Sequence, residues 1–168
     1  MGYTTDFEGS FTCTPALNQA QVAYLKQFSE TRRMKRYSAK AELHPDPLRL
    51  AVELPIGIDG EYFIGGFGSM GQDNDDSVKE HNDPPRTQPG LWCQWIPNED
   101  GTEIEWDGNE KFYNYVEWLK YLNANFFRKW GIVLSGEVTW SGESGDDFGK
   151  IIAKEGLIST KKGQVSYK

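Results

Sequence analysis

The chain has 168 residues, the length of one domain, and a formal net charge of −7. A negative surface repels the phosphate backbone, so this charge excludes general nucleic-acid binding. No apolar run reaches the length of about 18 residues that a membrane helix needs, and the N-terminal segment MGYTTDFEGS lacks the pattern of a secretion signal. These features predict a cytoplasmic protein, in which Cys13 and Cys93 remain reduced.

The first part of the chain predicts a strand followed by a helix. Residues 3–13 are rich in β-branched and aromatic residues with rough alternation, and Gly9 marks a bulge or a close approach of two backbones. Residues 18–37 predict a helix that Asn18 caps, because apolar side chains recur there on one face.

The middle of the chain is less regular. A short helix is expected at residues 48–52 and a second strand at residues 61–65 (EYFIG). A polar segment without periodicity follows at residues 66–90, and we interpret it as a long loop insert. It begins with GFGSMG (66–71), which matches the dinucleotide fingerprint, but no helix is predicted after it, so a glycine hinge is the better interpretation.

All six tryptophans fall between Trp92 and Trp140, so this window must contain most of the core. It begins with a predicted hairpin of residues 91–96 and 102–106. Asn109 is expected to cap a helix over residues 110–129, which has the clearest apolar periodicity in the chain. Three further strands are predicted at residues 132–140, 149–154 and 157–159, the last two joined around residues 155–156.

This order of elements predicts a single α+β domain over residues 1–168. Hairpin-type connections imply an antiparallel sheet of about five to seven strands, with two long helices packed on one face. Two passages from strand to helix to strand are also compatible with a ferredoxin-like core.

The residues suited to metal binding do not form a recognisable set. His44 and His81 have no third ligand near them in sequence, so no zinc site is evident. Residues 73–77 have the composition of a calcium loop but not its spacing. The weak candidates for a metal are Glu143, Asp146 and Asp147, in a turn rich in Gly and Ser; we expect neither a cofactor nor a catalytic residue.

The most unusual charge feature is RRMKR at residues 32–36. Three interpretations stay open. The cations could complement the C-terminus of the first helix, bind an anionic ligand or acidic partner, or pair with the acidic residues of 73–83. The candidate binding residues are Arg32, Arg33, Lys35 and Arg36.

Aromatic residues also lie off the main apolar stripe of the 110–129 helix. Trp118 and Tyr121 are either packed beneath the 66–90 segment or present their rings to a ligand, a partner or a second copy of the chain. We keep both as candidate anchors, because Trp and Tyr dominate many binding surfaces.

The phrases PGLWCQWIPNEDGTEIEWDGNEKFYNYVEWLKYL and GEVTWSGESGDDFGKI resemble a family of small uncharacterised proteins of bacteria and their phages. The resemblance implies a stand-alone cytosolic protein and brings no established activity. Together with the residues, it predicts a non-enzymatic binding protein, such as a phage or prophage accessory factor that blocks a host protein or sequesters a small anionic ligand. The alternative is a small metal-dependent enzyme acting on a nucleotide or phosphoester.

Overall fold

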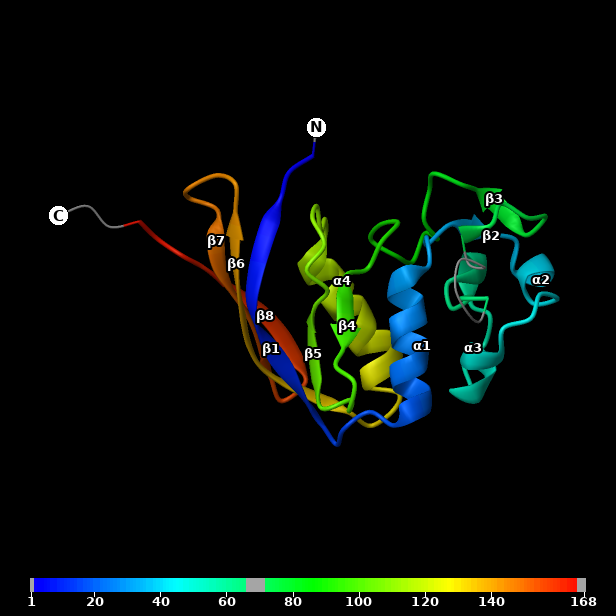
Figure 1. The fold of residues 1–168 in the computed structure, drawn as a ribbon, viewed down its shortest axis with the longest axis horizontal. Coiled ribbons are helices and arrows are strands. Elements are labelled where there is room, and N and C mark those ends of the chain that lie inside the picture. The colour runs from blue at the N-terminus through cyan, green and yellow to red at the C-terminus, as the bar shows by residue number, and fades with distance from the viewer. Residues whose placement is uncertain (1, 66–71, 166–168) are drawn as a thin grey trace. The chain divides into compact units, whose positions relative to one another are not determined.

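The computed structural model describes residues 2–65 and 72–165 (Figure 1). The chain forms two compact units, one of residues 1–17 and 94–168 and the other of residues 18–93. We call them the sheet unit and the inserted unit, because the second interrupts the first in sequence. The prediction of one domain over 1–168 stays a prediction, since two compact units can belong to a single domain.

The sheet unit is built on an antiparallel sheet of six strands in the order β4-β5-β1-β6-β7-β8 (Figure 1). The predicted α+β class and number of strands are therefore confirmed. The strands are β1 (Thr5–Thr14), β4 (Trp95–Pro97), β5 (Glu103–Trp106), β6 (Val133–Gly142), β7 (Phe148–Lys154) and β8 (Leu157–Lys162).

Four of these strands are connected as in a ferredoxin-like core. β1 lies between β5 and β6 and is antiparallel to both, so β5 and β6 are parallel, and α4 (Tyr115–Leu122) connects them. β5 likewise separates β1 from β4, and the connection between those two strands is the whole inserted unit. Each of these connections joins two parallel strands that have another strand between them. Two such connections give the ferredoxin-like strand order, and the β7–β8 hairpin extends the sheet beyond β6.

Alternate residues of each strand face opposite sides of the sheet. Phe7 on β1 is buried, whereas its neighbours Asp6 and Glu8 are exposed. α4 packs on the buried face: the ring centroids of Phe7 and Tyr115 are 4.9 Å apart, and the Trp95 indole N–H donates to the Tyr115 carbonyl. We call the opposite, solvent-exposed side the open face.

Gly9 provides the close approach that its position in the first strand predicts. Its φ is +102°, and a Cβ added there would lie 2.7 Å from the carbonyl oxygen of Glu137 on β6. A side chain at this position would be strained by the backbone conformation and would also collide with the neighbouring strand.

The long helix of the sheet unit begins later than predicted. Asn109 does not cap it, because Lys111 and Asn114 both have positive φ and interrupt the helical backbone before Tyr115. α4 then continues directly into η3 (Asn123–Phe127), a turn of π-helix. Such π-helical turns are rare and occur mostly as single turns within or beside α-helices.

The inserted unit opens with α1 (Gln19–Glu30), which confirms the predicted cap. The Asn18 side chain accepts from the backbone N–H of Gln21, whose own side chain accepts from the N–H of Asn18. This reciprocal pair is a capping box. The helix ends at Glu30, seven residues before the predicted end at residue 37, and Thr31 is extended.

The rest of the inserted unit consists of short elements. They are β2 (Lys35–Arg36), α2 (Ser38–Ala41), α3 (Pro47–Ala51), η1 (Ile58–Gly60) and β3 (Val78–Glu80), and β2 pairs with β3. α3 confirms the short predicted helix. The prediction of a strand at residues 61–65 is wrong, because these buried residues have no β partner. The glycine motif at 66–71 lies outside the described residues.

No helix in the described part of the chain has the length and apolar character needed to span a bilayer. Cys13 and Cys93 are free thiols, and both are buried.

Candidate functional site

The structure places the basic run after α1 rather than on it. Arg33 and Arg36 are 2% and 3% exposed, while Arg32 and Lys35 are half-buried. A burial this deep is unusual for arginine and requires compensating hydrogen bonds. These two guanidinium groups therefore belong to the interior of the inserted unit.

Arg33 holds the irregular segment that follows η1. Its Nη1 donates to the carbonyl of Phe63 at 2.8 Å and its Nη2 to the carbonyl of Glu61 at 2.6 Å. The guanidinium carbon also lies 4.2 Å from the centroid of the Phe28 ring. Because the segment has no strand or helix partner, the arginine supplies the donors that its buried carbonyls need.

Arg36 connects β2 to the loop before β3. Its Nη1 lies 2.7 Å from Ser77 Oγ and 3.4 Å from Asp75 Oδ2. Burial lowers the pKa of Arg36, an effect that the negative charge of Asp75 opposes. At the surface, Arg32 donates to the carbonyl of His81 and the side chain of Asn82. Pairing of the run with the acidic segment 73–83 is thus seen at Arg36, and docking of an external anion on Arg32 and Lys35 stays a prediction.

Trp118 and Tyr121 are core residues in this structure. Trp118 is 0% exposed and Tyr121 7%, and their rings meet edge to face with centroids 5.6 Å apart. Tyr121 makes a second edge-to-face contact with Phe126 on η3. Their role as anchors for a partner stays a prediction, and it would require exposure of side chains that are now buried.

The acidic turn between β6 and β7 forms hydrogen bonds that hold neighbouring parts of the sheet unit. Glu143 accepts the backbone N–H of Thr4, and the two oxygens of Asp147 accept from Tyr3 Oη and the Trp140 indole. The hydrogen bonds from Tyr3 and then Trp140 lower the pKa of Asp147. These contacts fasten the start of β1, and they use carboxylate oxygens that a cation at Glu143, Asp146 and Asp147 would need.

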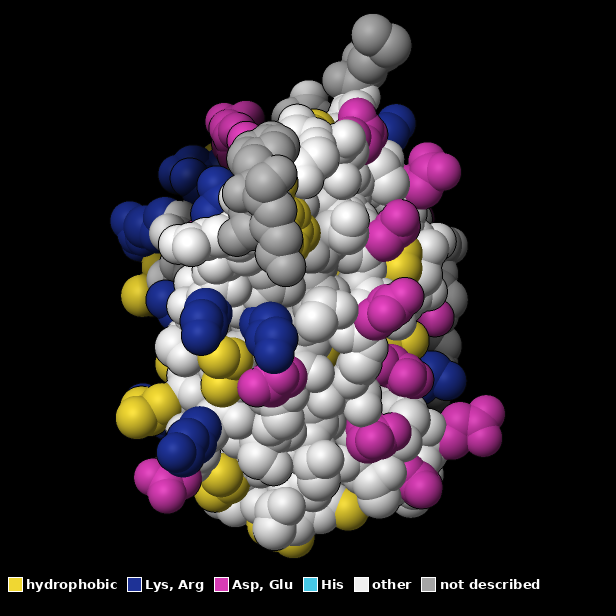
Figure 2. All heavy atoms as spheres, turned by 90° about the vertical axis from the view of Figure 1, so that its left-hand side faces the viewer, with side chains coloured by type: hydrophobic (Ala, Val, Ile, Leu, Met, Phe, Trp, Pro, Cys, Tyr) yellow, Lys and Arg dark blue, Asp and Glu magenta, His cyan; other side chains and the backbone are white. Residues whose placement is uncertain are grey.

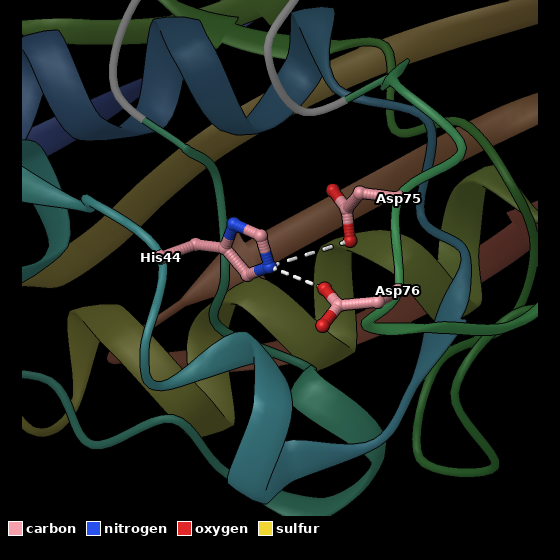
Figure 3. A group of neighbouring side chains, drawn as sticks. All are labelled: His44, Asp75 and Asp76. Atoms are coloured by element: carbon pink, nitrogen blue, oxygen red, sulfur yellow. Dashed lines mark hydrogen bonds and ion pairs between the residues drawn. The ribbon is translucent and has the colours of Figure 1, made fainter.

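A group suited to holding a metal lies instead in the inserted unit. Figure 3 shows His44 pointing at the neighbouring carboxylates of Asp75 and Asp76. Among the described residues, this is the group of three whose ligand atoms all lie within 4.8 Å of one another. Burial alone would raise the pKa of Asp75, but two hydrogen bonds from Ser77 and the charges of Arg36 and His44 lower it.

The sheet unit contains a hollow of about 490 Å³ at the end of strands β6, β7 and β8, which we call the lysine pocket. Three lysines line it: Lys150 on β7, and Lys161 and Lys162 on β8. Phe148 lies at the same end of β7 and contributes apolar surface beside the ammonium groups. The pocket therefore combines positive charge with an aromatic wall.

Strand register brings Lys150 and Lys161 together, while Lys162 is paired with Gly149. Lys150 is directly opposite Lys161 across the β7–β8 pair, and Thr139 is opposite Lys150 on β6, so all three lie in one row on the open face. Lys150 is bridged to Glu137 at 3.3 Å, whereas Lys161 forms no ion pair with any described residue.

The open face separates its charges. Its exposed lysines lie on β7 and β8, and its carboxylates on β1, β5 and β6, namely Asp6, Glu8, Glu103, Glu105 and Glu137. Figure 2 shows the same tendency, with most Lys and Arg along one side and most Asp and Glu along the other. A chain of net charge −7 thus presents a local positive region, which draws small anions to that edge.

The sequence analysis predicted neither the lysine pocket nor the group of His44, Asp75 and Asp76. A sequence pattern does, however, indicate part of the lysine pocket. The predicted turn at residues 155–156 fixes the register of the last hairpin and places Lys150 opposite Lys161. No comparable pattern predicts that His44 lies near Asp75, because the chain between them is irregular and forms no hairpin with a fixed register.

Comparison of the chain with protein-family models, with curated proteins and with solved structures finds no match. The resemblance to small bacterial and phage proteins therefore stays a prediction.

Proposed function

We propose that this protein is a non-enzymatic binding protein that takes a small anionic ligand in the lysine pocket. The observation that carries the proposal is a hollow of about 490 Å³ whose wall combines Lys150, Lys161 and Lys162 with the ring of Phe148. Pockets for small molecules have volumes of roughly 300–1,000 Å³ and pair apolar surface with a few polar groups. The ligand class that fits is an anion with a flat apolar body, such as an aromatic carboxylate, a sulfonate or a nucleotide.

Electrostatics favour a single orientation of such a ligand. The acidic half of the open face repels the anionic group, while Lys161 and Lys162 attract it at the opposite edge. Because the site is open to solvent, each ammonium group contributes modestly, about 0.5–1 kcal/mol. We therefore expect moderate affinity for the ligand. The anion-binding groups in this proposal are the pocket lysines, because Arg33 and Arg36 are buried.

The test uses 8-anilinonaphthalene-1-sulfonate, an aromatic anion whose fluorescence rises on binding. We expect one site per chain, and binding about tenfold weaker in the double variant Lys161→Gln/Lys162→Gln, because two cations are lost. Lys154→Gln is the matched control, since Lys154 is an exposed lysine of β7 that does not line the pocket. Equal affinity in the double variant and the control would refute the proposal.

Competition by nucleotides and aromatic carboxylates would then narrow the ligand class. Steady turnover of p-nitrophenyl phosphate by the purified protein would favour the alternative of a phosphoester enzyme. The prediction of a host protein as partner requires its own experiment, because a pocket of this size accommodates a small molecule.

A further inference from the structure

Two separate segments of the inserted unit bring nitrogen and oxygen ligands together. His44 lies between α2 and α3, and Asp75 and Asp76 lie just before β3 (Figure 3). His44 Nε2 is 2.8 Å from Asp76 Oδ1 and 3.6 Å from Asp75 Oδ1. One imidazole and two carboxylates thus meet at a point, although 31 and 32 residues separate them along the chain.

These separations are close to the spacing of ligands around one cation. Metal–nitrogen and metal–oxygen bonds of about 2.1 Å place two ligands about 3.0–3.4 Å apart on octahedral or tetrahedral ions. The two separations, 2.8 and 3.6 Å, lie just below and just above that interval. Small side-chain rotations would therefore admit the ion, which would take the place of the direct contact between His44 Nε2 and Asp76 Oδ1.

The neighbouring residues hold one ligand in place and leave the site accessible. Asp75 Oδ1 accepts from the backbone N–H and the hydroxyl of Ser77, and Oδ2 lies 3.4 Å from Arg36. Carboxylates that bind metals are commonly fixed by such hydrogen bonds. The side chains of His44 and Asp76 are 33% and 70% exposed, so water can complete the coordination.

We propose that His44, Asp75 and Asp76 bind one divalent transition-metal cation. An imidazole ligand favours ions such as Co²⁺, Ni²⁺ or Zn²⁺ over Mg²⁺ and Ca²⁺, which prefer sites made of oxygen alone. The bound ion would fasten the loop between α2 and α3 to the segment before β3. It lies in the inserted unit, so the proposal is independent of ligand binding to the lysine pocket.

The experiment titrates tag-free protein with Co²⁺ and records its visible absorption. We expect one Co²⁺ per chain, and affinity at least tenfold weaker in His44→Gln and in Asp76→Asn. His81→Gln and Asp73→Asn are matched controls, since both replace exposed side chains outside the group and should leave the affinity unchanged. Circular dichroism without metal verifies that each variant is folded, which the exposure of the replaced groups leads us to expect.

A second measurement locates the ion. Mn²⁺ should broaden amide resonances around residues 44 and 75–76 first, at substoichiometric concentration. Co²⁺ affinity that is unchanged by His44→Gln, or broadening centred elsewhere, would overturn the proposal. Binding of Ca²⁺ as tight as that of Co²⁺ and insensitive to His44→Gln would overturn it as well, because it would indicate a site of oxygen ligands only.

Discussion

Replacing Arg33 by methionine tests whether the basic run is structural. The substitution keeps a long apolar stem but removes the hydrogen bonds to Phe63 and Glu61, each from a charged donor. Such bonds contribute about 1.5–3 kcal/mol each. The substitution also removes the longer bond of 3.4 Å from Arg33 Nε to Gln88 Oε1. The Glu61 carbonyl retains a bond from Gln88 Nε2, whereas the Phe63 carbonyl loses the bond from Arg33. We expect unfolding to become easier by about 3–4 kcal/mol, a large share of a typical stability of 5–15 kcal/mol.

Urea unfolding followed by circular dichroism measures this loss, provided that the slope of free energy against urea is unchanged. Arg32→Met is the control, because Arg32 bonds His81 and Asn82 at the surface and should cost less than about 1 kcal/mol. Arg33→Lys keeps the charge but loses the bidentate geometry, and an intermediate loss is expected. If Arg33→Met and Arg32→Met destabilise equally, the structural role assigned to Arg33 is refuted.

Three further predictions concern single positions. Gly9→Ala should destabilise by about 2–3 kcal/mol in thermal unfolding, because φ is +102° and a Cβ would meet Glu137, whereas Gly145→Ala should be nearly neutral. Asn18→Ala should cost about 1 kcal/mol through loss of the capping box, and a change below 0.3 kcal/mol would contradict it. Burial, and secondarily Glu103, raise the pKa of Cys13 from 9.0 to about 12. The unfolded chain then binds fewer protons above pH 9, so stability should fall as pH rises from 9 to 12, less steeply in Cys13→Ala.

Local chemistry was sufficient for the regular elements. The cap at Asn18 and the turn at 155–156 each involve residues close in sequence, so a sequence pattern can identify them. The errors occurred where tertiary contacts decide the backbone. Residues 61–65 have the composition of a strand. The Arg33 guanidinium, however, donates hydrogen bonds to the carbonyls of Glu61 and Phe63, which therefore do not need a neighbouring strand. Positive φ at Lys111 and Asn114 likewise delays α4, against the apolar periodicity of 110–129.

By itself, the sequence determined the α+β class, the strands of the main sheet and the crowding of aromatic residues into its core, because periodicity and turn residues act over a few positions. Only the tertiary structure decided that Arg33 and Arg36 are interior, that Lys150, Lys161 and Lys162 share a hollow, and that His44 meets two carboxylates. A cationic side chain attracts any anion close to it, but the sequence does not show which anionic residue will lie close in the folded chain. That proximity is set by how distant segments pack.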